Sequence, residues 1–301
     1  MRIAADCVPC LLNRVLFETE LVDPALKDEA MAIAVKILAE RFHPGVNSAA
    51  VATKVHRAVY DAIGSDDPYS ELKERANQIA RSLYPRAESF VTRSADRFEA
   101  ACLMSIIGNV LDFGLGIGYD EPEDLSREFD ALVAQGLSVN DCARMKELLA
   151  KGSSVVYLMD NCGEIVFDRL LVKELKRMGA RVVGVVKGAP ILTDVTEADL
   201  LSTGMDQVFD AWLSTGSFAI GIDTTLIGQP LLDELGKADL IISKGMANFE
   251  SLSDRAYPRV AYLMRTKCRP VAEAIGAGTD QNVVKLCVSR ENEDSVNKGR
   301  F

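Results

Sequence analysis

Side chains that could hold a cation first occur together near the middle of the chain. Asp160 and Asn161 follow a short apolar run, 155–159, that is rich in β-branched residues and is typical of a buried strand. A helical pattern comes next and closes at Gly179. Oxygen-bearing side chains at the end of a parallel strand lie where open α/β sheets bind ligands. They can coordinate a hard cation, or they can simply cap the helix that follows.

Two later segments supply further polar groups. Asp194 follows the second predicted strand through a loop, and Lys244, Asn248 and Glu250 follow a later strand. Together with Asp160 and Asn161 they would form an oxygen-rich cation site beside a lysine, which is the pairing that a phosphate group needs. Residues 243–248 lack the Walker A spacing, and no G-x-G-x-x-G follows a strand in this half, so a dinucleotide is not indicated.

The elements that must position these groups change in character after residue 150. Strands alternate with helices in the second half, and we expect the strands at 155–159, 181–186, 207–210, 239–243, 260–265 and 283–288. Such spacing implies right-handed crossovers and a mostly parallel sheet with helices on both faces. The predicted fold class is therefore α/β, with a doubly wound, Rossmann-like sheet.

The first half is predicted to be helical. Apolar spacing, Pro and Gly favour helices over 11–21, 24–38, 48–63, 69–83, 89–113, 122–134 and 139–149. We therefore divide the chain into an all-helical domain over 1–150, an α/β domain over 151–290 and a charged tail over 291–301.

Composition narrows the classes of function. The 301 residues are 48% hydrophobic and carry a net charge of −10, which argues against nucleic-acid or acidic-membrane partners. No apolar run is long enough to span a membrane or to form a signal peptide, so we expect a cytoplasmic protein with reduced cysteines. The two histidines are expected to be a turn residue, His43, and a helix-surface residue, His56.

Several motifs, taken in order, resemble the metal-dependent damage-control phosphatase family, formerly a domain of unknown function, which includes the acidic-residue-methyltransferase-1-like proteins. They are Asp160-Asn-Cys-Gly-Glu164, Pro190-Ile-Leu-Thr-Asp194 and Lys244-Gly-Met-Ala-Asn248-Phe-Glu250. Gly108-Asn109-Val-Leu-Asp112-Phe-Gly114 resembles another segment of the family. Cys7-Val-Pro-Cys10 resembles its prokaryotic and archaeal branch.

The resemblance implies a divalent cation (Mg, Mn, Co or Ni) and hydrolysis of phosphate monoesters of small metabolites such as sugar phosphates. It implies that Asp160, Asn161 and Asp194 are metal ligands. It also implies that the phosphate and substrate are held by Lys244, Gly245, Met246, Asn248, Glu250, Asn109, Asp112 and Lys267. Asp160 and Lys244 would be the catalytic residues, with Lys244 stabilising charge on the phosphoryl oxygens. Whether a carboxylate acts as nucleophile or as base stays open.

Two other functions remain possible on the sequence. One is an S-adenosylmethionine-dependent carboxyl methyltransferase, although Asp160 and Asn161 occupy the place of its usual glycine-rich loop. The other is a non-catalytic protein that binds a metabolite. Cys7 and Cys10 have the spacing of half a zinc site, so they could bind a metal, act in redox chemistry or simply pack in the core. The oligomeric state is not indicated.

Overall fold

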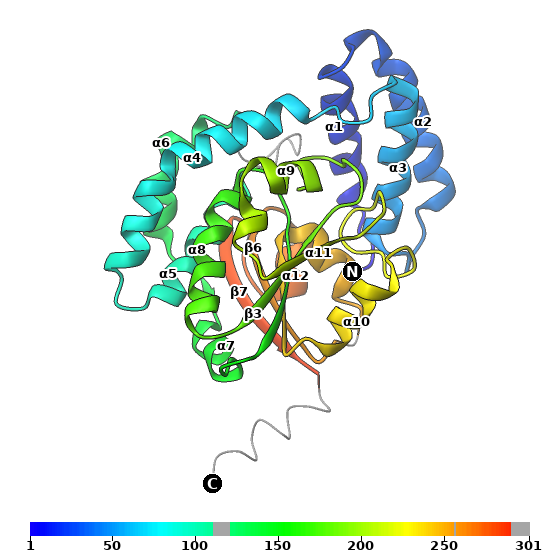
Figure 1. Ribbon diagram of the computed structural model, residues 1–301. Helices are drawn as coiled ribbons and strands as arrows, with labels where there is room; N and C mark the ends of the chain where they lie inside the picture. The colour runs from blue at the N-terminus through cyan, green and yellow to red at the C-terminus, as the bar shows by residue number, and fades with distance from the viewer. Residues whose placement is uncertain (111–120, 256, 290–301) are drawn as a thin grey trace.

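The computed structural model describes residues 1–110, 121–255 and 257–289, and within them seven strands form one sheet (Figure 1). The spatial order is β1-β7-β6-β5-β2-β3-β4. The strands are β1 (Val139–Asn140), β2 (Ser154–Leu158), β3 (Arg181–Val186), β4 (Ala211–Ser214), β5 (Leu240–Lys244), β6 (Arg259–Thr266) and β7 (Gln281–Val288). All neighbours are parallel except β6 and β7, so the predicted α/β class with a mostly parallel sheet is confirmed.

The order of the strands reverses between β2 and β5. From β2 the chain moves outward to β3 and β4, and then returns to β5, β6 and β7 on the other side. This is the order of a dinucleotide-type doubly wound sheet, which leaves a crevice beyond the carboxyl ends of the two central strands. The segments that follow β2 and β5 therefore flank the natural place for a ligand.

Helices cover both faces of the sheet. One face packs against α5 (Arg97–Ile107), α7 (Cys142–Leu148) and α8 (Glu164–Arg177). The other face carries α10 (Gln229–Lys237), α11 (Gly245–Leu252) and α12 (Arg269–Ile275). The remaining helices are α1 (Cys7–Glu20), α2 (Lys27–Arg41), α3 (Ser48–Ile63), α4 (Ser70–Arg93), α6 (Asp124–Gln135) and α9 (Glu197–Ser202). Short 3₁₀ turns occur at Pro24–Leu26, Gly108–Val110 and Met205–Gln207.

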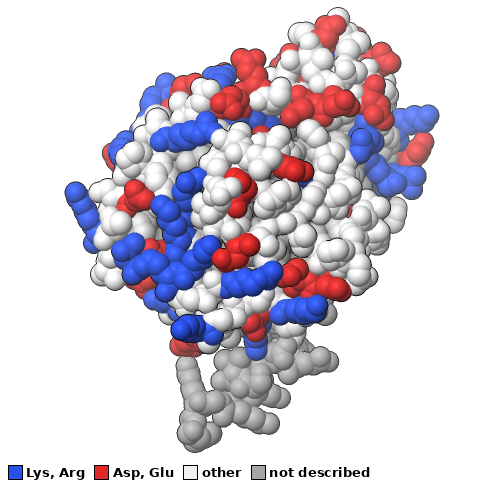
Figure 2. Space-filling view, viewed as in Figure 1, with Lys and Arg blue, Asp and Glu red and all other residues white. Residues whose placement is uncertain are grey.

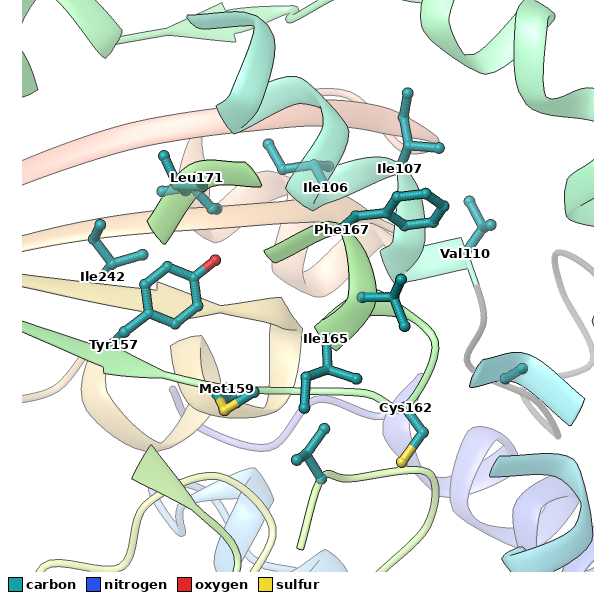
Figure 3. Packing of buried hydrophobic residues seen from close by; sticks show 14 of the residues in the cluster. Ile106, Ile107, Val110, Tyr157, Met159, Cys162, Ile165, Phe167, Leu171 and Ile242 are labelled. Atoms are coloured by element: carbon teal, nitrogen blue, oxygen red, sulfur yellow. The ribbon is translucent and has the colours of Figure 1, made fainter. Parts of the chain in front are cut away.

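The helical first half is joined to the sheet through a shared core. Val155 and Tyr157 of β2 belong to the same hydrophobic cluster as residues of α1, α3 and α5, whereas their neighbours Val156 and Leu158 belong to the cluster on the opposite face. This alternation follows from the pleat of a strand. Figure 3 shows Phe167 of α8 and Tyr157 packed among apolar side chains of the first cluster. The division at residue 150 stays a prediction.

Three expected elements were placed wrongly. Residues 139–149 begin with the edge strand β1, which pairs with β7, before α7 starts. Pro85 lies inside α4, so this helix continues to Arg93 and the predicted helix over 89–113 does not exist as one element. The strand expected at 207–210 is β4, and it starts only at Ala211.

Charged side chains of α8 take part in ion pairs at the surface. Figure 2 shows a group of basic residues on the face that carries α8. Lys173 of this helix pairs with Glu88, Lys176 with Asp210 and Arg177 with Glu174, and all three pairs are exposed or partly exposed. Such surface pairs contribute little to stability individually. Within the described residues, none of the helices combines the length and apolarity required to cross a lipid bilayer.

Candidate active site

The loops after β2 and β3 are held together by backbone hydrogen bonds. Cys162 N donates to Thr193 O at 2.8 Å, and Val195 N donates to Asp160 O at 2.8 Å. Asn161 and Asp194 consequently form an isolated antiparallel bridge. Since these bonds fix the backbone of both loops, the three predicted metal ligands lie next to one another at the carboxyl edge of the sheet.

The helical region fixes the same loops from outside. Asn77 of α4 accepts a hydrogen bond from Gly163 N at 2.6 Å, at a turn where Gly163 has a φ of +80°. Tyr60 of α3 accepts one from Leu192 N at 3.0 Å, where Leu192 has a φ of +49°. Positive φ is unfavourable for a leucine. The first half of the chain therefore holds strained backbone beside the predicted ligands.

The Asp160 carboxylate is oriented by two amides and by the start of α11. Its Oδ2 accepts hydrogen bonds from Asn161 Nδ2 at 2.7 Å and Asn109 Nδ2 at 2.9 Å. On its other side, a Cβ added at Gly245 would lie 1.7 Å from that oxygen, and Gly245 has a φ of +71°. Glycine is therefore required at this position both for the backbone and for the close approach of the carboxylate.

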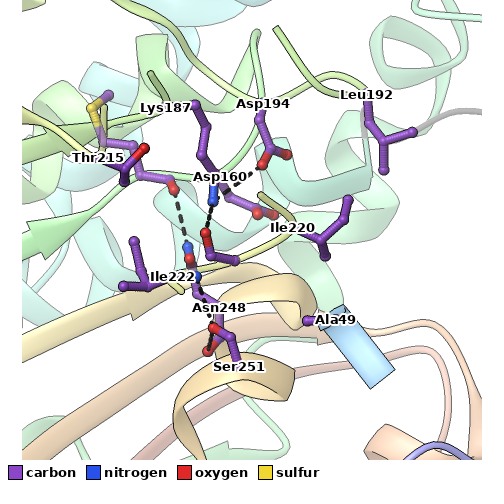
Figure 4. Close-up of polar contacts among 12 residues, drawn as sticks. Ala49, Asp160, Lys187, Leu192, Asp194, Thr215, Ile220, Ile222, Asn248 and Ser251 are labelled. Carbon is purple, nitrogen blue, oxygen red and sulfur yellow. Dashed lines mark hydrogen bonds and ion pairs between the residues drawn. The ribbon is translucent and has the colours of Figure 1, made fainter. Parts of the chain in front are cut away.

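The Asp194 carboxylate contacts a buried ammonium group. Lys187 Nζ lies 3.4 Å from Asp194 Oδ2 and also donates to the carbonyl of Gly221 (Figure 4). Lys187 and Asp194 are each only 3% exposed. The ion pair places a positive charge behind the carboxylate and restricts its orientation.

Asp160, Asn161 and Asp194 line one cavity of about 120 Å³. Its walls come from the sheet edge, from α1 and α3, from α11 and from the segment after β6. Among the described residues of these walls, four carboxylates (Asp6, Asp160, Asp194 and Glu250) face two basic side chains, Arg14 and Lys267. A phosphate would therefore meet excess negative charge unless a cation accompanied it.

A second group of polar side chains is sealed beneath this cavity. Lys244 is fully buried and donates to Ser105 O at 2.9 Å, to Asp168 Oδ1 at 2.6 Å and to Glu164 Oε1. Glu164 in turn accepts from Asn109 Nδ2 at 2.8 Å, and Asn109 also contacts Asp160. A chain of charge-assisted bonds thus runs from the ammonium group to the predicted metal ligand.

This buried network carries shifted pKa values. Burial, with help from the neighbouring Glu164 carboxylate, outweighs the attraction of Lys244 and raises the pKa of Asp168 to about 7. Burial alone would lower the pKa of Lys244, but the carboxylates of Asp168 and Glu164 reverse this and leave the pKa above its usual value. Lys244 therefore keeps its charge, and a proton can be shared at Asp168 near neutral pH.

The structure separates the predicted phosphate-binding residues into two groups. Met246, Glu250 and Lys267 line the cavity. Lys244, Asn109 and Asn248 do not: all three are buried at 1% exposure or less, and Asn248 Nδ2 donates to the carbonyls of Met159 and Lys244. Direct contact of these three with a phosphate in the cavity does not fit this placement. Gly245 does not line the cavity either, and it packs against the Asp160 carboxylate. Asp112 lies outside the described residues.

Other residues of the site were missed in the sequence. Arg14 and His56 line the cavity from α1 and α3, and the expectation that His56 lies on a helix surface is wrong because it is fully buried. Lys187 follows β3 just as Asp160 follows β2, a position that could have singled it out. No role was predicted for Glu164, which ends the motif that begins at Asp160.

Cys7, Cys10 and Cys268 also line the cavity, and none of the three forms a disulfide bond. In the part of the chain that the structure describes, no three His, Cys, Asp or Glu side chains are grouped as a metal site. The predicted cation site differs from such a group because it combines two carboxylates with the amide of Asn161.

Comparison with known proteins identifies the family. A model of the damage-control phosphatase ARMT1-like domain matches residues 3–283. The chain belongs to this family. It is therefore a phosphatase, and this function is favoured over a methyltransferase or a non-catalytic binding protein, as predicted from the motifs.

Individual relatives match over nearly their whole length. The chain is 42% identical to a damage-control phosphatase of Archaeoglobus fulgidus, over 95% of this chain and 99% of that protein. It is 30% identical to a damage-control phosphatase of Pyrococcus horikoshii, over 91% and 94% of the two chains. The crystal structure of a DUF89 family protein from Pyrococcus horikoshii superposes with a TM-score of 0.83 at 28% identity, covering 94% of this chain and 98% of that one.

Proposed function

We propose that this damage-control phosphatase depends on a divalent cation, of the class Mg, Mn, Co or Ni, and hydrolyses phosphate monoesters of small metabolites. The observation that carries the proposal is the convergence of Asp160, Asn161 and Asp194 on one cavity through paired loops. Carboxylate and amide oxygens are the donors that hard cations prefer. The excess of carboxylates in the cavity wall supports a cation for the same reason.

In this proposal Asp160, Asn161 and Asp194 hold the cation, which when bound polarises the phosphoryl group and orients the attacking water. Asp160 is kept in place by Asn109, Asn161 and Gly245, so its carboxylate is pre-organised. Lys187 limits the rotation of Asp194.

The phosphate itself would be met by Lys267 and Arg14, because these are the basic side chains in the cavity wall among the described residues. Met246 and Glu250 lie one helical turn apart on α11 and complete that wall. Lys244 takes a different role from the one expected. Through Glu164 and Asn109 it positions Asp160 rather than touching the substrate.

The test is release of inorganic phosphate from a panel of small phosphorylated metabolites with Mg²⁺, Mn²⁺, Co²⁺ and Ni²⁺. We expect turnover that disappears with a chelator and returns with metal. Asp160→Asn and Asp194→Asn should each lower kcat/KM by roughly 10³-fold or more while the protein stays folded, because charge stabilisation is lost from the reacting centre. Full activity without metal, or in both variants, would contradict the proposal.

A further inference from the structure

A buried histidine faces the same cavity from the side opposite the sheet. His56 is 0% exposed on α3, and its side chain forms part of the cavity wall. Its Nδ1 lies 2.9 Å and 3.1 Å from the two carboxylate oxygens of Glu18, which is also fully buried on α1. Two helices of the first half of the chain, α1 and α3, therefore bring an imidazole to the site.

The contact with Glu18 determines which nitrogen is available. A carboxylate at Nδ1 keeps a hydrogen on that nitrogen and leaves Nε2 as the functional end of the ring. Nε2 is buried and has no hydrogen-bond partner among the described residues. Buried polar atoms are almost always satisfied, so one that is left over beside a cavity calls for a ligand atom.

A structural role alone does not account for this arrangement. A histidine that only filled the core would have both nitrogens satisfied or would be replaced by an apolar residue at lower cost. Here one nitrogen is held by a carboxylate, the other has no hydrogen-bond partner among the described residues, and the ring lines the cavity that Asp160 and Asp194 also line. The same pattern, a nitrogen held by a carboxylate and a second nitrogen aimed at the reacting group, occurs in histidines that transfer protons in enzymes.

We propose that His56, positioned by Glu18, is the catalytic acid that gives a proton to the leaving oxygen of the phosphate ester. The inference rests on the proposed phosphatase function and adds a specificity: it suits esters of poorly acidic alcohols, such as sugars and polyols. The predicted metal ligands lie on the side of the sheet edge and His56 lies on the side formed by α1 and α3, so the two act on different parts of the ester.

The proposed step forms one bond to phosphorus and breaks another. The oxygen of a water molecule forms a bond to phosphorus, and the bond between phosphorus and the ester oxygen breaks. The electron pair of that bond stays on the ester oxygen, which takes the proton from Nε2 of the protonated His56 and leaves as an alcohol. The attacking water releases one proton to solvent, and His56 regains a proton from solvent before the next turnover.

The experiment measures how kcat/KM depends on the leaving group. Ethyl, 2,2,2-trifluoroethyl, phenyl and p-nitrophenyl phosphate form a series in which the alcohol becomes more acidic and needs less protonation. In His56→Gln, which keeps a polar amide but has no proton to transfer, we expect roughly 10²-fold loss for ethyl phosphate and less than about 3-fold loss for p-nitrophenyl phosphate. Glu18→Gln should steepen the same dependence by a smaller amount.

The chain offers a matched control in its second histidine. His43 is exposed in a turn, with Nδ1 3.3 Å from Pro44 O, so His43→Gln should leave the whole series unchanged. The ratio of kcat/KM between two esters does not depend on the fraction of folded protein. A partly unfolded His56→Gln therefore still gives a valid result.

The outcomes separate the inference from the proposed function. An equal loss across the series, or no loss, in His56→Gln would overturn proton donation by His56 while metal-dependent turnover stood. Absence of turnover for every ester in the wild type with every metal would overturn the proposed function itself, and the role of His56 with it.

Discussion

Polar side chains at the carboxyl edge of the sheet form two layers with different surroundings. The outer layer (Asp160, Asn161, Asp194 and Lys267) lines the cavity, and the inner layer (Asn109, Glu164, Asp168 and Lys244) is sealed beneath it. Asn109 joins the layers by donating to both Asp160 and Glu164. Similar residue types therefore have separate tasks: the outer layer can contact a substrate, whereas the inner layer fixes the geometry of the outer one.

The largest expected difference in stability lies between variants of two lysines, one in each layer. Lys244→Met leaves Glu164 and Asp168 buried without their cation, so the free energy of unfolding should fall by about 3–5 kcal/mol. Lys267→Met removes a charge from the cavity wall and should change stability by less than about 1 kcal/mol. It should nevertheless raise KM and lower kcat/KM by roughly 10-fold or more, because a charged hydrogen bond to phosphate is lost.

Urea unfolding and steady-state kinetics of both variants check this contrast. Equal losses of stability would show that the two layers do not differ as the structure indicates. Unchanged kinetics in Lys267→Met would remove this residue from the phosphate site.

A smaller loss of stability is expected for a change at Gly245, where α11 meets the outer layer. Gly245→Ala adds a Cβ 1.7 Å from Asp160 Oδ2 at a φ of +71°, so it must displace the carboxylate as well as strain the backbone. Gly276→Ala is the matched control, since Gly276 has a φ of +78° with nothing within 4 Å. Both should lose about 1–2 kcal/mol from the unfavourable φ. Only Gly245→Ala should lower kcat by roughly 10²-fold through misplacement of a catalytic group.

Circular dichroism on heating and phosphate release measure the two effects separately. If Gly276→Ala lost as much activity as Gly245→Ala, the close contact with Asp160 would not be the cause.

A further prediction concerns the pH dependence of the inner layer. The pKa of Asp168 is raised to about 7 in the folded protein, above its unfolded value of about 3.9. The folded chain therefore binds a proton that the unfolded chain lacks between these pH values. The stabilisation from this proton is complete below about pH 4 and is lost as the pH rises through 7.

Asp168→Asn removes this titration and serves as the reference. We expect the free energy of unfolding of the wild type, relative to Asp168→Asn, to decrease between about pH 4 and pH 7. Denaturant titrations at several pH values measure it. A relative stability that stays constant or increases over this range would contradict the raised pKa.

The ligand set at the sheet edge could be predicted because it depends on local order. Asp160 and Asn161 directly follow an apolar, β-branched strand, and parallel strands bring their carboxyl ends to one edge. The strands of the sheet could also be predicted from local apolar patterns, except for the strands at its two edges. β4 is short and half-buried along its length, so its apolar pattern is weak and the expected strand fell on Val208 and Phe209 instead.

The sequence did not predict the direction of the Lys244 side chain, which is determined by the pleat of β5. Ile242 and Lys244 are two residues apart in β5, so both side chains point to the face covered by α5 and α8. There Glu164 and Asp168 receive the ammonium group, away from the cavity. Asn248 differs from Met246 and Glu250 in the same way, because it lies between them on the opposite side of α11.

The part of the cavity wall that α1 and α3 form could not be predicted, because its contacts join residues that are distant in sequence. Glu18 and His56 are 38 residues apart, and the cavity they face is completed by residues more than 100 positions further along. Neither residue stands in a motif with a spacing that indicates chemistry. Only the packing of α1 against α3 and of α3 against α11 brings them to the site.

Mn²⁺ binding, measured by electron paramagnetic resonance without any substrate, tests the predicted cation site most directly. We predict one bound ion per wild-type chain, and loss of that ion in both Asp160→Asn and Asp194→Asn with the fold intact. Lys267→Met, which removes no predicted ligand, should still bind it. Mn²⁺ binding that is unchanged in both aspartate variants would contradict the claim that the paired loops after β2 and β3 form a cation site.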